Sequence, residues 1–291
     1  SFTIVDVAIF HDVLAANMSL LVQSCRENLA LLAIPQYFLA ISGVSKHFCS
    51  ILIHYLMENI QELGNKPFDE AQIFLRLFKL VFLSVTVYPE ENESVLLPYL
   101  SEIITISLRH SLKTSQPLNY FLLLKSLFRS IGGGRYELLY KEVLPLLPLL
   151  LETLNSMLKN TTNKQLVELF VELCLTAPVR LSTLLPHLSW LMKPLLVALG
   201  SSNELVIQGL RTLELCIDNL QQDFIDPILA PYYHQLIYAL WAHLNQCHTI
   251  KIMLMLLFVF WENYREDAPN CSKTNFLLCL KVQMLFVPVC F

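Results

Sequence analysis

The sequence repeats one helical design at intervals of 41 to 47 residues. Four prolines each stand before an apolar stretch with helical spacing, and successive members of the set lie 47, 41 and 45 residues apart: Pro98, Pro145, Pro186 and Pro231. A second apolar helix pattern lies between successive prolines. Intervals of about 40–47 residues with two helices each are typical of HEAT and armadillo arrays. The period therefore predicts an all-α chain, a right-handed α-solenoid of about six HEAT-like helix pairs.

The composition favours a chain that buries apolar surface along its whole length. Only 15% of the 291 residues are charged, 7 are glycine, and the mean hydropathy is +0.52. A repeat array escapes the usual size limit on a single core, so the length is compatible with one continuous array. The formal net charge of −4 gives no overall attraction to nucleic acid or to anionic membranes. We therefore expect protein partners, no direct nucleic-acid binding and no membrane association.

The cysteine pattern and the first ten residues indicate the redox compartment of the protein and whether a signal peptide is present. Eight cysteines are scattered without any C-x-x-C pair, and Cys174 and Cys216 lie inside apolar helical patterns. Buried, reduced thiols of an intracellular protein explain this better than a disulfide framework. The chain begins SFTIVDVAIF, with neither Met nor a basic segment. We expect no secretory signal here, and we expect the sequence to be an interior piece of a longer protein.

A membrane protein is an alternative because of the high hydropathy. Residues 28–45 and 227–250 lack Asp, Glu, Lys and Arg, but both stretches contain proline and the second contains several polar side chains. The purest apolar run, residues 252–261, is shorter than the roughly 20 residues of a spanning helix. The pattern thus disfavours a polytopic membrane protein without removing it.

Helices are expected throughout the first 250 residues, which we assign to the repeat array. The clearest patterns cover residues 48–64, 68–88, 120–131, 145–158 and 165–177, and another follows a turn at residues 200–203. In the second of these, residues 89–92 are expected to end the helix, and Arg76 and Lys79 lie opposite its apolar face. Residues 251–291 contain no countable period, so we assign them to a diverged or atypical tail.

Two groups of residues could indicate catalysis, and neither pattern supports it. Three glycines, residues 132–134, follow a helix and precede no GK[ST] sequence, so they indicate a helix break and not a phosphate loop. Glu168 and Glu172 are four residues apart on one helix, and Glu214 and Asp218 repeat the arrangement. We interpret both pairs as solvated helix faces, because no nucleophile or histidine pattern accompanies them.

A metal site is equally weakly indicated. His243 and Cys247 share a helical face and His248 follows, but no second ligand pair has zinc-site spacing. Structural zinc requires four protein ligands. We therefore predict no metal, no other cofactor and no catalytic residue.

The most informative local feature is a basic segment in this acidic chain. The stretch from residue 113 to residue 142 contains five basic residues and only two glutamates. Lys125 and Arg129 are i, i+4 neighbours beside Phe121 and Phe128, and Arg135 follows. A basic and aromatic helix surface suits an acidic, apolar peptide, so these three cations form a candidate partner-binding site. An ordinary solvated face with long aliphatic stems is the alternative.

Several long runs of the sequence resemble those of a known protein family. They are NYFLLLKSLFRSIGGGRYELLYKEVLPLLPLLLETLN at 119–155, LFVELCLTAPVRLSTLLPHLSWLMKPLLVAL at 169–199 and QGLRTLELCIDNLQQDF at 208–224. These runs closely resemble the helical solenoid of the phosphatidylinositol-3-kinase-related family, in its pseudokinase branch. The resemblance is strongest over residues 68–224 and extends to about residues 48 and 244. It implies a HEAT-repeat segment distant from a kinase-like domain that lacks catalytic residues.

The same resemblance implies a function. Members of this branch are non-catalytic scaffolds of nuclear histone acetyltransferase and coactivator complexes, where they present surfaces to acidic transcriptional activators and neighbouring subunits. We therefore expect a nuclear scaffold segment and no enzyme. Another HEAT-array adaptor, such as a nuclear transport receptor that binds targeting peptides and a small GTPase, is the alternative.

Overall fold

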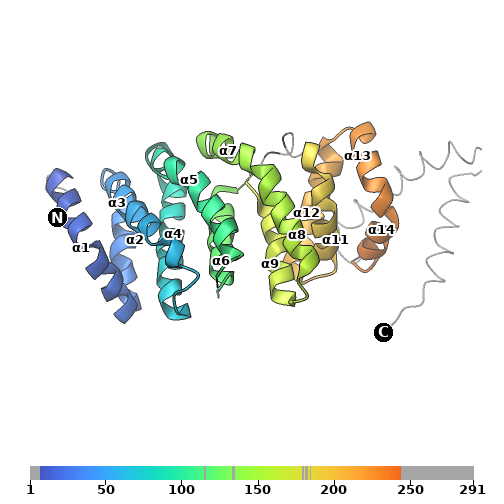
Figure 1. Ribbon diagram of the computed structural model, residues 1–291. Helices are drawn as coiled ribbons and strands as arrows, with labels where there is room; N and C mark the ends of the chain where they lie inside the picture. The colour runs from blue at the N-terminus through green and yellow to red at the C-terminus, as the bar shows by residue number, and fades with distance from the viewer. Residues whose placement is uncertain are drawn as a thin grey trace, which may run out of the picture. The chain divides into compact units, whose positions relative to one another are not determined.

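The structure is a computed structural model that describes residues 7–243, except 115, 133–134, 179, 181–182 and 184. Within these residues the chain is helical and contains no strand, so the predicted all-α class of HEAT-like helix pairs is confirmed. The α-helices (Figure 1) are α1 (Val7–Glu27), α2 (Ala33–Leu39), α3 (Ser45–Glu58), α4 (Phe68–Val87), α5 (Pro89–Ser111), α6 (Leu118–Ile131), α7 (Glu137–Val143), α8 (Leu147–Asn160), α9 (Lys164–Thr176), α11 (Ser189–Leu199), α12 (Asn203–Asn219), α13 (Gln222–Leu229) and α14 (Tyr233–Trp241). Short 3₁₀ turns adjoin several of them: η2 (Leu29–Leu32), η3 (Ile60–Glu62), η5 (Leu144–Leu146), η6 (Leu185–His187) and η7 (Ala230–Tyr232).

The chain divides into two compact units, Ser1–Pro194 and Leu195–Phe291. In the first unit α4 contacts α6 and α6 contacts α9, which gives one layer of helices. A second layer runs through α3, α5 and α7, and the two layers meet where α5 contacts α4 and α6. In the second unit, α12 contacts α13. Each helix thus buries its apolar stripe against neighbours in the chain, as a repeat array requires.

The predicted apolar faces form the core. On α4 the side chains of Phe74, Leu77, Phe78, Val81 and Val85 are all buried. Each such side chain contributes about 1.5–3 kcal/mol relative to an exposed position. The sequence pattern therefore predicted correctly which side of this helix faces inward.

The sequence period reappears as the spacing of the polar contacts that join neighbouring repeats. Tyr88 Oη donates to Ala40 O over 48 residues, and Asn92 Nδ2 donates to Ser45 Oγ over 47 residues. Glu93 Oε1, on α5, accepts from the backbone nitrogens of Leu138 and its neighbour at the start of α7, 45 and 46 residues away. That carboxylate satisfies helix donors that have no partner within α7 and lies at the positive end of the helix.

The role predicted for the prolines is wrong in one respect, because they do not begin the long helices. Pro98 lies inside α5, while Pro145, Pro186 and Pro231 lie in η5, η6 and η7. All four are exposed. A proline removes one i→i−4 hydrogen bond, and at a solvent-facing position the freed carbonyl can bind water. Pro145 and Pro231 thus lie in 3₁₀ turns between two α-helices and Pro186 lies in such a turn just before α11, whereas α5 continues through Pro98.

Two helix boundaries were predicted only in part. Helix α4 ends at Val87, just before Pro89 as expected, but residues 89–92 already belong to the next helix. Pro89 occupies the first turn of α5, where its fixed φ is favourable, and Glu90 and Glu91 follow it at the positive end. The helix expected over residues 48–64 ends at Glu58 and continues as η3. The tail assigned to residues 251–291 lies outside the described residues, so the proposed division of the chain stays a prediction.

Candidate partner-binding surface

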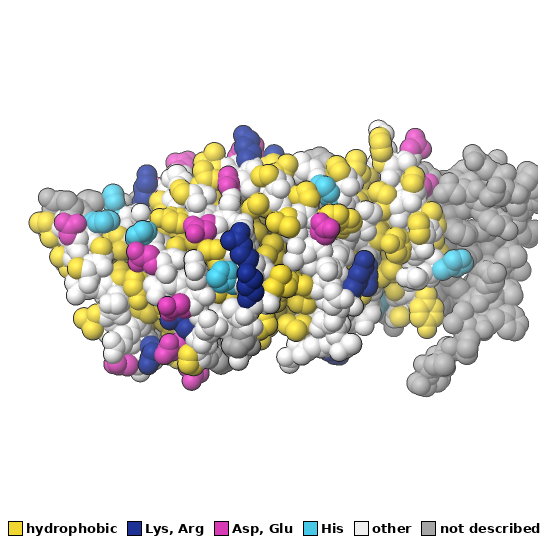
Figure 2. Space-filling model, viewed as in Figure 1, with side chains coloured by type: hydrophobic (Ala, Val, Ile, Leu, Met, Phe, Trp, Pro, Cys, Tyr) yellow, Lys and Arg dark blue, Asp and Glu magenta, His cyan; other side chains and the backbone are white. Residues whose placement is uncertain are grey.

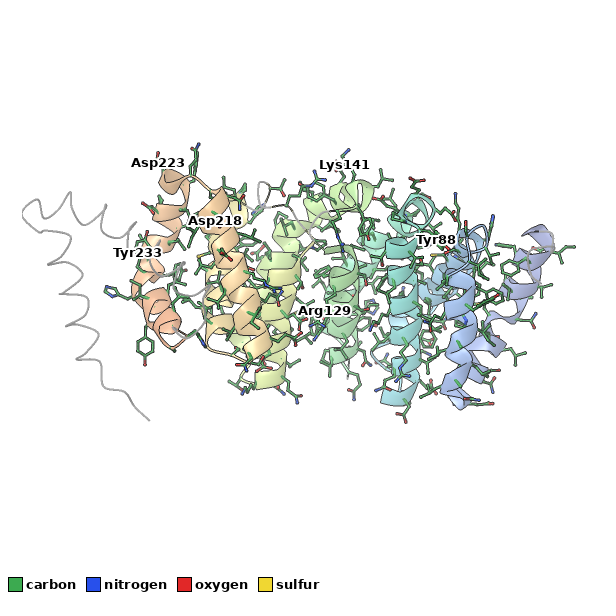
Figure 3. All side chains as sticks on the ribbon, turned by 180° about the vertical axis from the view of Figure 1, so that it is seen from behind. Tyr88, Arg129, Lys141, Asp218, Asp223 and Tyr233 are labelled. Carbon is green, nitrogen blue, oxygen red and sulfur yellow. The ribbon has the colours of Figure 1, made fainter. Side chains whose placement is uncertain are left out.

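Helix α6 places Lys125 and Arg129 together at its outer face. Four residues separate them, so they lie one turn apart on the same side of the helix. Their side chains are 31% and 48% exposed. Figure 3 labels Arg129 on α6. The two cations are therefore close together and partly accessible, as the sequence predicted.

Both cations bind the same carboxylate, Glu172 on α9. Lys125 Nζ lies 2.8 Å from Glu172 Oε2, and Arg129 Nη2 lies 2.5 Å from Oε1. Arg129 Nε also donates to Oε1 at 2.7 Å. The contact joins neighbouring repeats over 43 residues in sequence. Charge-assisted bonds of this kind are short and specific in geometry, so this ion-paired triad fixes α6 against α9.

The interpretation of Glu172 as part of a solvated face is wrong. Its residue exposure is 6%, while Glu168 on the same helix is partly exposed. A buried carboxylate requires compensating charges and hydrogen bonds, and Lys125 and Arg129 supply them. The triad has a net charge of +1, since two cations surround one anion.

The aromatic part of the predicted surface is also absent. Phe121 and Phe128 are 3% and 1% exposed, and the Phe121 ring packs edge-on against Phe170 at 4.8 Å. These rings belong to the core between α6 and α9. Exposed apolar contacts for a partner at this surface must therefore come from other residues.

Arg135 lies beyond the end of α6 and takes no part in the triad. It is exposed, and its guanidinium lies 5.8 Å from the centroid of the Tyr136 ring. The first residue of the glycine run, Gly132, follows the last residue of α6, which agrees with a helix break; residues 133–134 lie outside the described part. Of the three predicted site residues, the structure brings two into contact with a common partner.

A second pair of cations lies on the neighbouring helix; the sequence placed both on its outer side but did not include them in the candidate site. Arg76 and Lys79 on α4 are exposed, and neither has an ion-pair partner among the described residues. The buried and exposed positions of residues 71–81 recur almost unchanged at 121–131, which puts Lys79 and Arg129 at equivalent places. The sequence could have indicated this equivalence, because α4 and α6 each begin directly after a proline and their first residues lie 50 positions apart.

Another inter-repeat cluster lies at the edge formed by α7. Glu137 accepts from Arg180 and binds Lys141 Nζ at 3.4 Å, and the Arg180 guanidinium lies 4.2 Å from the Tyr140 ring centroid. The Arg180 hydrogen bond is the main reason that the pKa of Glu137 is lowered, with Lys141 adding to it. Tyr140 Oη also donates to Thr183 Oγ1 at 3.0 Å. The Arg180–Glu137 and Tyr140–Thr183 hydrogen bonds each span 43 residues and join two repeats.

The remaining residues that the sequence suggested for metal binding or catalysis form no such site among the described residues. His243 Nε2 lies 2.7 Å from Leu199 O, and Cys247 and His248 fall outside the described residues. Glu214 is partly exposed and Asp218 is exposed. The part of the chain that the structure describes contains no cluster of three or more potential metal ligands. Among its helices, none has both the length and the apolar content needed to cross a bilayer.

Burial changes the chemistry of the cysteine side chains. Cys49 and Cys174 are buried, and desolvation raises their pKa values to about 11 and about 12. Desolvation also raises the pKa of Cys216 to about 11. Thiols with such values are protonated and unreactive at neutral pH. They fill the core, as the sequence predicted for Cys174 and Cys216.

These features define the class of the protein: a HEAT-repeat array whose repeats are joined by polar contacts at the repeat interval. Residues 1–247 match the family described as the Tra1 HEAT repeat central region. The chain belongs to this family.

Several named proteins are similar in sequence to most of the chain. The transformation/transcription domain-associated protein of Homo sapiens is 45% identical over 279 residues, which cover 95% of this chain. Transcription-associated protein 1 of Drosophila melanogaster is 46% identical over 270 residues, or 92% of the chain. The SAGA complex/NuA4 acetyltransferase complex subunit Tra1 of Schizosaccharomyces pombe is 42% identical over 250 residues. The chain spans 7% of the length of each of these relatives.

Proposed function

We propose that this chain is a non-catalytic scaffold segment of a nuclear histone acetyltransferase and coactivator complex. The observation that supports the proposal is the 42% identity, over 85% of the chain, to a relative named as a SAGA and NuA4 subunit. The structure adds a physical basis, because stacked repeats offer extended surfaces to other proteins. In this proposal the chain works by holding partners and not by chemistry.

Two kinds of partner follow from it. Neighbouring subunits of the complex bind the array, and acidic transcriptional activators dock on a basic surface that includes Lys125, Arg129 and Arg135. The localisation that goes with these partners is the nucleus. Nuclear transport remains the competing function, because HEAT arrays of that class also bind peptides.

Purification of the native protein distinguishes the two functions. The protein is tagged in its cells of origin and isolated, and the bound proteins are identified by mass spectrometry. A coactivator scaffold brings down a histone acetyltransferase and its activity on nucleosomes. Recovery of a small GTPase and transport cargo without acetyltransferase activity would overturn the proposal in favour of a transport receptor.

A further inference from the structure

The outer face of α4 is amphipathic along its length. Arg76, Lys79, Leu83 and Val87 follow each other at spacings of three and four residues, which puts them on one side of the helix. Leu83 and Val87, one turn apart on this face, are 40% and 55% exposed. This face is thus basic near the middle of the helix and apolar towards its C-terminal end. Elsewhere too, apolar side chains reach the surface of the described part (Figure 2).

Helices α4 and α6 begin at the same edge and run in the same direction. Asn119 Nδ2, in the first turn of α6, donates to Leu63 O at 3.0 Å, and Gln116 N donates to Gly64 O at 3.1 Å, just before α4 begins. At 1.5 Å per residue, Lys79 and Arg129 both lie about 17 Å along their helices. Since the two helices are in contact, the cations of α4 and α6 lie at the same height on adjacent helices.

Two of the cations on this surface have no ion-pair partner among the described residues. Lys125 and Arg129 share the carboxylate of Glu172, whereas Arg76 and Lys79 are exposed and form no such pair. These two unpaired cations lie in a chain whose formal net charge is −4. Such a local excess attracts anionic groups of a partner.

A buried hydroxyl lies within the same group of cations. Ser126 Oγ, on α6 between Lys125 and Arg129, is buried and has no hydrogen-bond partner. Helices α6 and α9 begin 46 residues apart, at Leu118 and Lys164, and in this register Ser126 corresponds to Glu172. Helix α6 therefore carries a hydroxyl at the position where α9 carries the carboxylate of the triad.

We propose that the outer face of α4 and α6 binds an acidic, amphipathic helical segment of another protein. Its carboxylates pair with Arg76 and Lys79, and its apolar side chains cover Leu83 and Val87. The inference deepens the proposed recruitment function and rests on it, but it moves the docking residues from Arg135 to the cations of α4. A peptide fits better than a nucleic acid, because half of the surface is apolar and a carboxylate is already buried beside the cations.

The test is a fluorescence-anisotropy titration of the full 291-residue chain. The probe is a labelled helical 20-residue peptide, with Asp and Glu on one face and Leu and Phe on the other. Arg76→Glu with Lys79→Glu is the principal variant, because neither residue contributes to an internal ion pair. Lys46→Glu with Lys159→Glu is the matched control, since it changes the net charge equally on the other layer of helices.

The expected results are specific to the surface. The principal variant binds at least about 10-fold more weakly, a loss of about 1.4 kcal/mol, while the control binds as the parent does. Leu83→Gln with Val87→Gln also weakens binding, and so does Ser126→Glu, which keeps every cation but adds an internal carboxylate. Helicity by circular dichroism is unchanged in all of them.

Three results would overturn the inference. The first is that the principal variant binds the peptide as tightly as the parent does. The second is that the control variant loses as much peptide affinity as the principal variant. The third is that a DNA duplex of the same length competes with the labelled peptide as well as the unlabelled peptide does. The proposed function has a separate readout, because the tagged native protein carrying Arg76→Glu and Lys79→Glu still brings down the acetyltransferase if the scaffold function holds. If the tagged protein without substitutions brings down no acetyltransferase, the proposed function is refuted, while the binding surface is not.

Discussion

Removal of the charge of Glu172 should weaken the contact between two repeats. Glu172→Gln keeps the volume of the side chain but removes the anion that Lys125 and Arg129 surround at 2.8 and 2.5 Å. The two cations then lose the carboxylate that lies between them. Because the amide oxygen can still accept one bond from Arg129, part of the interaction is retained.

The magnitude follows from how exposed the three groups are. Removing one partner of a fully buried pair costs about 3–5 kcal/mol, whereas an exposed pair contributes about 0–1 kcal/mol. Glu172 is buried, but Lys125 and Arg129 are 31% and 48% exposed and can recover water. The expected loss in the free energy of unfolding is therefore about 2 kcal/mol. For a chain of this size that corresponds to about 4–8 °C in Tm.

Chemical denaturation followed by circular dichroism measures this loss. Glu152→Gln is the control, because Glu152 is an exposed carboxylate on α8 with no ion-pair partner among the described residues. A double-mutant cycle with Arg129→Met should give a coupling free energy of about 1 kcal/mol. If Glu172→Gln unfolds at the same urea concentration as Glu152→Gln, the triad does not hold α6 against α9 and the reasoning fails.

Three further outcomes are expected. Gly64→Ala should lose about 2 kcal/mol of stability in urea denaturation, because the new Cβ would lie 2.7 Å from Thr114 Cβ, and a result within error of the parent would contradict that close approach. Arg180 lowers the pKa of Glu137 from 4.5, so its contribution to stability is present above pH 4.5 and is lost as the pH falls through the lowered value; the stability difference between the parent and Glu137→Gln should shrink with acidification, and a constant difference would argue against the pairing. Cys174, with a pKa of about 12, should be alkylated by iodoacetamide far more slowly in the native chain than in urea, as peptide mass mapping would show, and equal rates would place it at the surface.

The fold could be predicted well from sequence wherever one helix buries one apolar face. The expected helices at 68–88, 120–131 and 165–177 differ from α4, α6 and α9 by at most two residues at either end. The apolar period determines these elements, because only one face of each helix can meet the neighbouring helices. The position of the proline could not be predicted in the same way. A proline inside a long helix is disfavoured by local rules, yet α5 runs from Pro89 to Ser111 with Pro98 inside it.

The candidate surface was predicted in part. The i, i+4 spacing of Lys125 and Arg129 was visible, but the burial of Glu172 depends on a contact 43 residues away, which local periodicity does not encode. A comparison of successive repeats would have found it, because opposite charges stand one repeat apart. The same comparison relates Lys79 to Arg129 at 50 residues. Charge patterns in such arrays therefore have to be analysed between repeats as well as along each helix.

Cross-linking mass spectrometry on the native complex tests most directly the claim that this chain is a protein-binding scaffold segment. Exposed lysines on both layers, among them Lys79, Lys141 and Lys159, provide the reactive positions. We predict cross-links from these lysines to other subunits of an acetyltransferase complex, together with links inside the chain between adjacent repeats. Cross-links confined to the chain itself, or joined only to transport cargo, would contradict the account.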